Sequence, residues 1–326
     1  MHFKIFSTVM AAAFSLLMLP LNASAVMHET KRPDKSTIYW SLDMPEKSSG
    51  KADLIVLMQG SGCEPTTRNK NMQMIRSAFG DFASLTVEKY GIHPNYQAET
   101  EEGYFQDCPP EYHQNSTHDQ RVADYLQVFK ELADAKWWSG RLVLLGGSEG
   151  GDIAVRVASR ISTSGVILIS TGGGMTFGEQ VKASILMDME QKNVPEAQRP
   201  DIDALFKDVR ENKNSDKMLF GYSYKYWANS IDYKALDDML KINAPILLLH
   251  GSADTSAPAQ SARQAVEAFQ QKNRCNLTYW ELSGHDHGMN DPQGQNHMNS
   301  VLSQASVWIN TQLAADNVSS YVTNSQ

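Results

Sequence analysis

The 326-residue chain has only three cysteines, carries no excess of basic residues and contains no internal repeat. Its 29 Lys and Arg are outnumbered by 37 Asp and Glu, which gives a net charge of -8. This balance argues against nucleic acid as a partner, because proteins that bind it gather positive charge on one face. After residue 25 no apolar run is long enough to cross a bilayer. With 41% hydrophobic and 20% charged residues, the chain has the composition of a folded globular protein.

The first 25 residues have the pattern of a secretory signal peptide. One basic residue, Lys4, precedes an apolar run over residues 5–21, and Ala23-Ser24-Ala25 is the small-x-small pattern that signal peptidases cleave. The alternative is a retained membrane anchor, but the run is short for about 30 Å of hydrocarbon and ends in a cleavage site. We therefore expect residues 1–25 to be removed. The remaining chain, without a stable membrane anchor, is expected to be exported to a bacterial periplasm or beyond.

The expected export changes how the three cysteines are interpreted. Cys63, Cys108 and Cys275 form no C-x-x-C pair and lack the spacing of zinc ligands. In an oxidising compartment two of them can form a disulfide. Cys63 and Cys108 both lie in loop-like sequence, whereas Cys275 directly precedes a predicted strand, so a Cys63–Cys108 disulfide is the candidate. Three buried thiols are the alternative.

Short apolar segments alternate with amphipathic segments along the chain. Continuous apolar runs such as residues 54–58 are typical of strands that are buried on both faces of a sheet. Strands are predicted at 36–42, 54–58, 85–87, 142–145, 166–169, 246–249 and 277–282, and helices at 117–135, 152–160, 261–271 and 298–313. The alternation predicts an α/β fold with a doubly wound, mostly parallel sheet.

One long stretch interrupts this alternation. Residues 170–245 separate two predicted strands, which is too long for a loop, and they contain helical patterns without a convincing strand. We predict a helical cap over about residues 172–240, inserted into a single domain that spans residues 26–315. The aromatic run at 220–227 either packs this cap onto the domain or lines a substrate pocket. Residues 316–326 are predicted to form a polar tail.

The segment Gly146-Gly147-Ser148-Glu149-Gly150 matches the pattern G-x-S-x-G. It lies between a predicted strand and a predicted helix, which is the context that this motif needs to act as a nucleophile turn. The turn is so tight that flanking side chains would collide, which explains the glycines. It lifts the Ser148 hydroxyl above the sheet and directs the Glu149 backbone N–H toward a bound carbonyl. A glycine turn with an incidental serine is the alternative.

A second glycine-containing loop, Gln59-Gly60-Ser61-Gly62, follows the strand predicted at 54–58. Acyl transfer needs backbone N–H donors for the negative charge that develops on the carbonyl oxygen, and the Ser61 N–H would serve beside that of Glu149. A dinucleotide-binding loop does not fit, because Pro65 occupies the third glycine position. A phosphate-binding loop does not fit either, because no Gly-Lys-Ser/Thr follows.

Two further loops offer a carboxylate and an imidazole. Asp254 follows the strand predicted at 246–249, and a carboxylate there can fix the tautomer of a catalytic histidine. Its alternative role is that of a turn residue or a helix cap. After the last predicted strand, His285 and His287 are two candidates for a general base. A His-x-His metal site is disfavoured because no third ligand lies nearby in the sequence.

The order Ser148, Asp254, His287 along the chain is that of α/β-hydrolases. The segments LIVLMQGSG, LVLLGGSEGG, APILLLHGSADTSAP and ELSGHDHGM make residues from about 37 to 313 resemble α/β-hydrolase-fold serine hydrolases, of the exported bacterial esterase and prolyl-oligopeptidase-like type. The resemblance implies Ser148 as nucleophile, Asp254 as triad acid and His287 as base. It also implies an oxyanion hole made by the N–H groups of Ser61 and Glu149.

Two details of the match concern individual residues. The ending HDHGM is similar to the D-H-G-F/I ending of prolyl-oligopeptidase-like members, which favours His287 over His285. Gln59 occupies the position before the oxyanion glycine where many relatives have His. This difference leaves the predicted oxyanion hole intact, but it does not indicate to which subfamily the chain belongs.

We therefore expect a serine hydrolase without a cofactor or metal that cleaves a small-molecule ester through an acyl-enzyme on Ser148. Carboxylic esters are the first expectation. A thioesterase, a peptidase or amidase, and an acyltransferase with an acceptor other than water would all use the same triad. A non-catalytic binding protein of the same fold is a further alternative, although no damaged motif indicates it.

Overall fold

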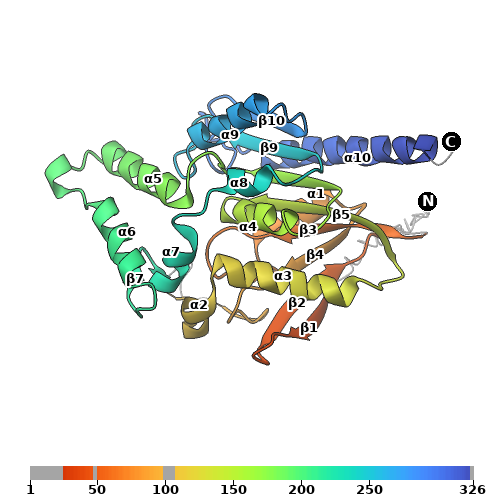
Figure 1. Ribbon diagram of the computed structural model, residues 1–326, viewed down its shortest axis with the longest axis horizontal. Helices are drawn as coiled ribbons and strands as arrows, with labels where there is room; N and C mark the ends of the chain where they lie inside the picture. The colour runs from red at the N-terminus through yellow and green to blue at the C-terminus, as the bar shows by residue number, and fades with distance from the viewer. Residues whose placement is uncertain (1–24, 47–49, 98–106, 324–326) are drawn as a thin grey trace, which may run out of the picture.

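The computed structural model describes residues 25–46, 50–97 and 107–323, so the predicted signal peptide, residues 1–25, lies outside the described residues except for Ala25. Eight strands form one sheet in the order β1-β2-β4-β3-β5-β6-β9-β10 (Figure 1). Their bounds are β1 Val26–Lys31, β2 Thr37–Asp43, β3 Ala52–Met58, β4 Ala83–Val87, β5 Trp138–Gly147, β6 Gly165–Ile169, β9 Ile246–Gly251 and β10 Leu277–Leu282. β2 pairs antiparallel with β1 and β4, and every other neighbouring pair is parallel. The predicted α/β fold with a mostly parallel sheet is confirmed.

Helices cover both faces of this sheet. Along β3, Leu54, Val56 and Met58 pack on one face, whereas Ile55 and Leu57 pack on the other. The first face is covered by α3 His118–Leu132, α4 Glu149–Ala158, α8 Ala235–Met239 and α9 Ala259–Gln271, and the second by α1 Lys70–Ala78 and α10 Met298–Thr323. Because neither face meets water, the central strands are largely apolar on both faces, which is why they contain continuous apolar runs in the sequence.

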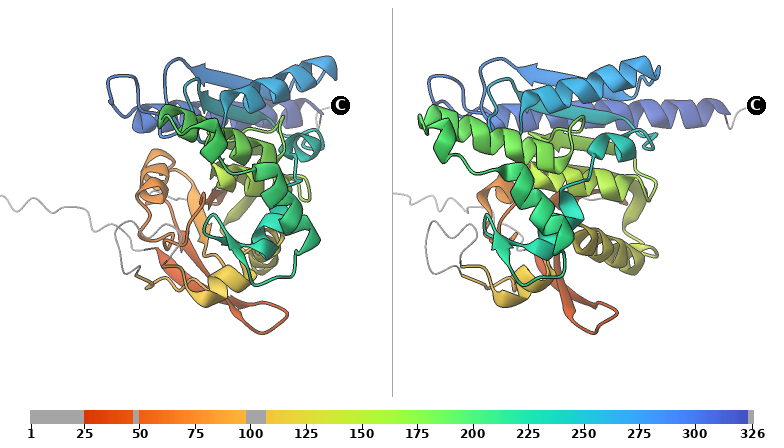
Figure 2. Two further views of the ribbon diagram at one scale, coloured as in Figure 1. Left: turned by 90° about the vertical axis from the view of Figure 1, so that its left-hand side faces the viewer. Right: turned by 60° about the vertical axis from the view of Figure 1, so that its left-hand side comes forward.

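The long segment between β6 and β9 forms helices that lie to one side of the sheet (Figures 1 and 2). It contains α5 Phe177–Gln191, the short 3-10 helix η1 Glu196–Gln198, α6 Ile202–Glu211, the two-residue strands β7 Met218–Leu219 and β8 Tyr222–Ser223, and α7 Tyr224–Ser230. From the aromatic run, Tyr222, Tyr226 and Trp227 are buried in a cluster with the apolar face of α6. These aromatic side chains therefore pack the cap onto the domain and do not form the wall of a pocket.

Several elements, among them β1, α8 and α10, differ from the predicted ones. β1 was not predicted, because it is an edge strand with mostly exposed side chains and no apolar run. α8, inside the predicted cap at 172–240, packs Leu236 and Met239 into the main core beside α4. α10 continues to Thr323, so most of the predicted polar tail at 316–326 is helical. Residues 313–318 contain no Gly or Pro that would end the helix after the buried Leu313.

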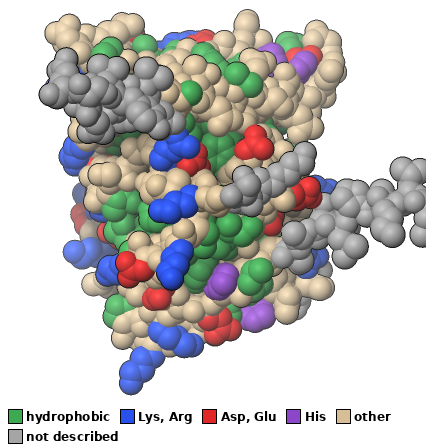
Figure 3. Space-filling model, turned by 90° about the vertical axis from the view of Figure 1, so that its right-hand side faces the viewer, with side chains coloured by type: hydrophobic (Ala, Val, Ile, Leu, Met, Phe, Trp, Pro, Cys, Tyr) green, Lys and Arg blue, Asp and Glu red, His purple; other side chains and the backbone are tan. Residues whose placement is uncertain are grey.

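The surface carries charges of both signs. Figure 3 shows the face away from the cap, where Lys and Arg side chains are interspersed with Asp and Glu. Among the helices of residues 25–46, 50–97 and 107–323, none has the length and hydrophobicity of a membrane span.

A disulfide joins Cys63, five residues after β3, to Cys108, just before α2 Pro110–Asn115, with the Cα atoms 5.7 Å apart. The predicted pairing is confirmed. Cys275 is exposed and unpaired, so the alternative of three buried thiols is wrong. Both bonded cysteines belong to the apolar cluster that also contains the cap aromatics.

We expect the Cys63→Ser, Cys108→Ser double variant to lose about 2–4 kcal/mol of unfolding free energy, because the disulfide closes a long loop in the unfolded chain. Urea unfolding of the two proteins measures the difference. The matched control is Cys275→Ser, which should unfold at the wild-type midpoint. Equal stability of the double variant and the control would contradict this prediction.

Candidate active site

Ser148 lies at the turn between β5 and α4, with backbone angles φ 52 and ψ -130. The positive φ is uncommon for a residue with a side chain and marks a strained turn. The glycines around it allow close backbone contact: a Cβ on Gly146 would lie 2.2 Å from Gly150 O, and one on Gly150 would lie 2.0 Å from Met58 O. The strand–turn–helix context predicted for this motif is therefore present.

Asp254 and His287 come together from two loops that follow β9 and β10. Nδ1 of His287 lies 2.8 Å from Oδ2 of Asp254, and the Asp254 side chain is fully buried. The backbone N–H groups of Ser256 and Ala257 donate to Oδ1 of Asp254 at 2.9 and 2.8 Å. Burial acts to raise the pKa of Asp254, but the hydrogen bonds with His250 and His287 outweigh it and hold this pKa well below its ordinary value. Asp254 therefore stays ionised beside the imidazole.

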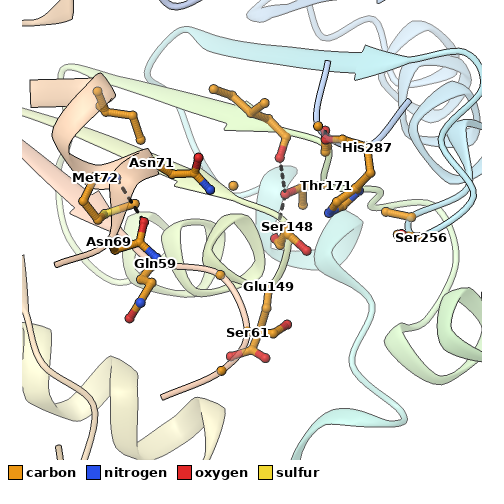
Figure 4. Close-up of a pocket in the computed structure, with 18 of the residues that line it drawn as sticks. Gln59, Ser61, Asn69, Asn71, Met72, Ser148, Glu149, Thr171, Ser256 and His287 are labelled. Atoms are coloured by element: carbon orange, nitrogen blue, oxygen red, sulfur yellow. Dashed lines mark hydrogen bonds between the residues drawn. The ribbon is translucent and has the colours of Figure 1, made fainter. Parts of the chain in front are cut away.

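The structure separates the two candidate histidines. His287 lines the same cleft as Ser148, and the two side chains point toward one another in Figure 4. Ser170, itself at φ 51, donates its hydroxyl to His287 O at 2.9 Å and so fixes the backbone of this loop. His285 instead lies 2.9 Å from Ser283 O through Nδ1, and its ring packs edge-on against His297. Only His287 of the two is paired with Asp254.

The loop Gln59-Gly60-Ser61-Gly62 follows β3 and lies directly against the turn that carries Ser148. A Cβ on Gly60 would be 3.2 Å from Gly147 O and 3.5 Å from the Ser148 Cβ. Ser61 and Glu149 both line the cleft beside Ser148, as Figure 4 shows. The fold thus places four of the five residues predicted for the site in the lining of one cleft, and it buries the fifth, Asp254, against His287. The five are spread over more than 220 positions of the chain, from Ser61 to His287.

The Glu149 side chain, which the motif leaves unspecified, is buried and forms an ion pair with Arg121 at 2.5 Å. Its other oxygen accepts a hydrogen bond from the Tyr226 hydroxyl at 2.7 Å. Burial acts to raise the pKa of Glu149, but Arg121 and Lys89 outweigh it and lower this pKa to about 2. The sequence did not indicate Arg121 or Lys89, because nothing in a linear pattern distinguishes a buried cation from a surface one.

His250, at the end of β9, is fully buried next to the site. Its Nε2 lies 2.7 Å from Ala257 O and 3.3 Å from Oδ2 of Asp254. From the end of β9, His250 therefore holds in place the loop that carries Asp254.

The cleft has a volume of about 890 Å³. On the side of α1 and α10 its wall holds the apolar side chains Met72, Met74, Ile75, Met298 and Leu302, next to the amides of Asn69 and Asn71. On the side of the cap, α5 contributes Phe177, Gln180 and Val181. No three His, Cys, Asp or Glu side chains gather into a metal-binding group in the part of the chain that the structure describes. The cleft thus combines an apolar wall with the polar groups of acyl transfer.

A second carboxylate, Asp152, lies one helical turn after Ser148 and also lines the cleft. It is 5% exposed, and none of the described residues donates a hydrogen bond to it. Burial and the neighbouring Glu149 outweigh the attraction of Arg156 and raise the pKa of Asp152 to about 7. This carboxyl group therefore takes up a proton at a pH where Asp254 remains ionised.

We expect Asp152→Asn to become more stable relative to wild type as the pH rises from 4 to 8. Asp152 ionises near pH 4 in the unfolded chain but only near pH 7 in the folded one, so wild-type stability falls between these values. The relative gain reaches up to about 4 kcal/mol, at about 1.4 kcal/mol for each pKa unit. Urea unfolding of both proteins across this range measures it. A difference that stays constant from pH 4 to 8 would contradict the prediction.

Comparison with known proteins identifies the family of the chain. Residues 106–293 match the family model described as serine aminopeptidase, S33. No curated protein matches the chain. Among solved structures, Est1E from Butyrivibrio proteoclasticus is similar with a TM-score of 0.58 and 17% identity, over 90% of this chain and 100% of that chain.

Two other similar structures are named for different activities. A monoacylglycerol lipase from Paleococcus ferrophilus has a TM-score of 0.51 and 17% identity, over 84% of this chain and 99% of that chain. A puromycin-hydrolyzing peptidase from Mycobacterium tuberculosis has a TM-score of 0.57 and 15% identity, over 86% of this chain and 37% of that chain. Identities this low show a shared fold. The family match covers more than half of the residues, and the chain therefore belongs to the serine aminopeptidase S33 family, as a serine hydrolase of the α/β-hydrolase fold.

Proposed function

We propose that the protein cleaves carboxylic esters through an acyl-enzyme on Ser148. His287 removes the proton from the Ser148 hydroxyl, which attacks the ester carbonyl, and the resulting imidazolium then protonates the leaving alcohol. Water, deprotonated by the same imidazole, releases the acid and regenerates the hydroxyl. The 2.8 Å contact between His287 and the buried, ionised Asp254, in the cleft that also contains Ser148, is the observation that carries this proposal.

Asp254 supports the chemistry by fixing His287. An ionised carboxylate at Nδ1 keeps the proton on that nitrogen, so Nε2 is free to accept the serine proton. It also stabilises the imidazolium that forms during attack. The N–H groups of Ser61 and Glu149 would bind the oxyanion, since both residues lie beside Ser148 where the carbonyl must approach.

The apolar side chains that α1 and α10 contribute to the cleft support an ester with an aliphatic acyl group. Met72, Ile75 and Leu302 offer no hydrogen-bonding side-chain groups to a peptide or sugar, whereas an alkyl chain gains about 0.8 kcal/mol for each CH₂ that it buries. A lipase and a peptidase share the fold, so the fold itself does not select the ester. Thioester and amide cleavage by the same residues remain the alternatives.

We also propose export to an oxidising compartment, for which residues 1–25 supply the signal peptide. The Cys63–Cys108 disulfide supports this, because such bonds persist outside the reducing cytosol.

A fluorophosphonate probe should label the wild-type protein and not Ser148→Ala, because the reagent reacts with an activated serine hydroxyl. We expect Ser148→Ala to lower the kcat for p-nitrophenyl acetate by at least about 10³-fold. Unchanged labelling of Ser148→Ala would show that another residue is the nucleophile. Faster turnover of p-nitroacetanilide than of p-nitrophenyl acetate by the wild type would replace the ester proposal with an amidase.

The two histidines of the same loop provide a matched pair. His287→Ala should lower kcat by about 10³–10⁴-fold, because it removes the general base, whereas His285→Ala should stay within a few-fold of wild type. Steady-state kinetics on p-nitrophenyl acetate measures both. Equal losses in the two variants would mean that the loop, and not the His287 imidazole, is what activity requires.

A further inference from the structure

Two buried cations lie behind the loop 59–62. Lys89, two residues after β4, and Arg121, on α3, are each 4% exposed. Nζ of Lys89 donates to Gly60 O at 2.5 Å and also to Gly62 O. Nη2 of Arg121 donates to Gln59 O at 2.5 Å. Three carbonyl oxygens of this loop, those of Gln59, Gly60 and Gly62, are thus held by buried basic side chains. Neither Lys89 nor Arg121 is among the described residues that line the cleft.

The contact at Gly60 fixes more than a carbonyl oxygen. Gly60 C=O and Ser61 N–H belong to one peptide unit, and the described chain contains no cis peptide bond. In a planar trans unit the C=O and N–H bonds point in opposite directions. Because Lys89 binds the oxygen on one side of this unit, the Ser61 N–H points to the other side. Ser61 lines the cleft beside Ser148.

We propose that Lys89 is a positioning residue for the reaction, and that its hydrogen bond to Gly60 O directs the Ser61 N–H at the oxygen on which negative charge develops. This inference rests on the proposed function, since it assigns the geometry of the oxyanion hole. An anchor is needed here because glycines at 60 and 62 leave the backbone unusually free to rotate, and Gly62 adopts φ 87. Lys89 removes this freedom without contacting the substrate.

The charges around Lys89 indicate that its donors matter more than its charge. Burial and the nearby Arg121 lower the pKa of Lys89 to about 7, against the opposing effects of Glu149 and Glu88. A neutral amine still carries two N–H groups, enough for both carbonyl oxygens. Glu149 is paired with Arg121, and Glu88 accepts hydrogen bonds from Thr66 at 2.9 and 2.7 Å. Removing the lysine charge therefore leaves no newly isolated carboxylate, so we expect Lys89→Met to fold.

The test compares Lys89→Met with wild type on p-nitrophenyl acetate and with a trifluoromethyl ketone, which forms a tetrahedral adduct with an oxyanion. A donor that acts mainly in the transition state changes kcat and leaves KM in place. We expect kcat to fall by about 10–100-fold, KM to stay within about twofold, and the inhibition constant of the ketone to rise by the same factor as kcat falls. Unchanged kcat in folded Lys89→Met, or a rise in KM alone, would overturn the proposal.

The matched control is Arg32→Met, which removes another buried cation. Arg32 is 5% exposed and binds Asp124 through two bonds of 2.8 Å, with no contact to the loop 59–62. This variant should melt at a lower temperature but keep kcat and ketone affinity within about twofold of wild type. Equal catalytic losses in the two variants would mean that the loss in Lys89→Met follows from lower stability, and would overturn the assignment.

Two further outcomes are covered by the same design. If Lys89→Met does not fold, Lys89→Gln takes its place, because its shorter side chain cannot reach both carbonyl oxygens, and the same results are required of it. If wild type turns over no ester, the ester proposal fails but the inference about Lys89 does not. The rate at which the fluorophosphonate, whose oxygen occupies the same hole, labels the protein must then be about 10–100-fold lower in Lys89→Met than in wild type. Equal labelling rates would overturn the inference.

Discussion

The start of α4 lies so close to the end of β3 that no side chain fits between them. A Cβ on Gly150 would lie 2.0 Å from Met58 O, well inside van der Waals contact. This approach requires glycine at 150 and brings the loop that continues β3 against the strained turn at Ser148. The proposed nucleophile and the two proposed oxyanion donors come from the two segments that meet here. The geometry of the cleft depends on this backbone contact before any side chain contributes.

Two aspartates in this region show how environment sets the behaviour of one side-chain type. Both are about 95% buried, yet Asp254 receives donors from two backbone N–H groups and His287, while Asp152 receives none from the described residues. Burial disfavours the ionised form in both cases. Only at Asp254 do hydrogen bonds outweigh it. One carboxylate is thereby kept charged to orient an imidazole, and the other titrates near neutral pH within the same cleft.

Much of the site was predictable because parallel strands end at a common edge. Ser148, Asp254 and His287 each lie in a loop that follows a predicted strand. The small residues of these loops indicated that their polar side chains belong to a site. The sheet could be predicted as well, since strands covered on both faces contain continuous apolar runs. β1 could not be, because an exposed edge strand has no such run. The choice of His287 over His285 came from the resemblance to a family, and it is the contact with Asp254 that gives it a physical basis.

The buried cations were beyond sequence reasoning for a different reason. Lys89 and Arg121 become meaningful only through contacts with backbone oxygens that lie 27 to 62 positions away along the chain. A side chain that binds main-chain carbonyl groups leaves no pattern in the sequence, because every residue carries such a carbonyl group and the partner can be of any residue type. The role of the Glu149 side chain could not be predicted either. The motif assigns a role only to the Glu149 backbone N–H, whereas its carboxylate forms an ion pair with Arg121, which is distant in the sequence.

The cap is joined to both segments that carry the proposed oxyanion donors. Gly62 N–H donates to the Tyr222 hydroxyl at 3.3 Å, and the Tyr226 hydroxyl donates to Glu149 at 2.7 Å. The rings of Tyr222 and Tyr226 are stacked with their centroids 4.0 Å apart, so the two contacts share one rigid unit. Next to Gly62, the disulfide at Cys63 holds the same end of the loop. A displacement of β8 and α7 would therefore move both sides of the proposed hole together, which makes the cap a structural part of the site and not only its cover.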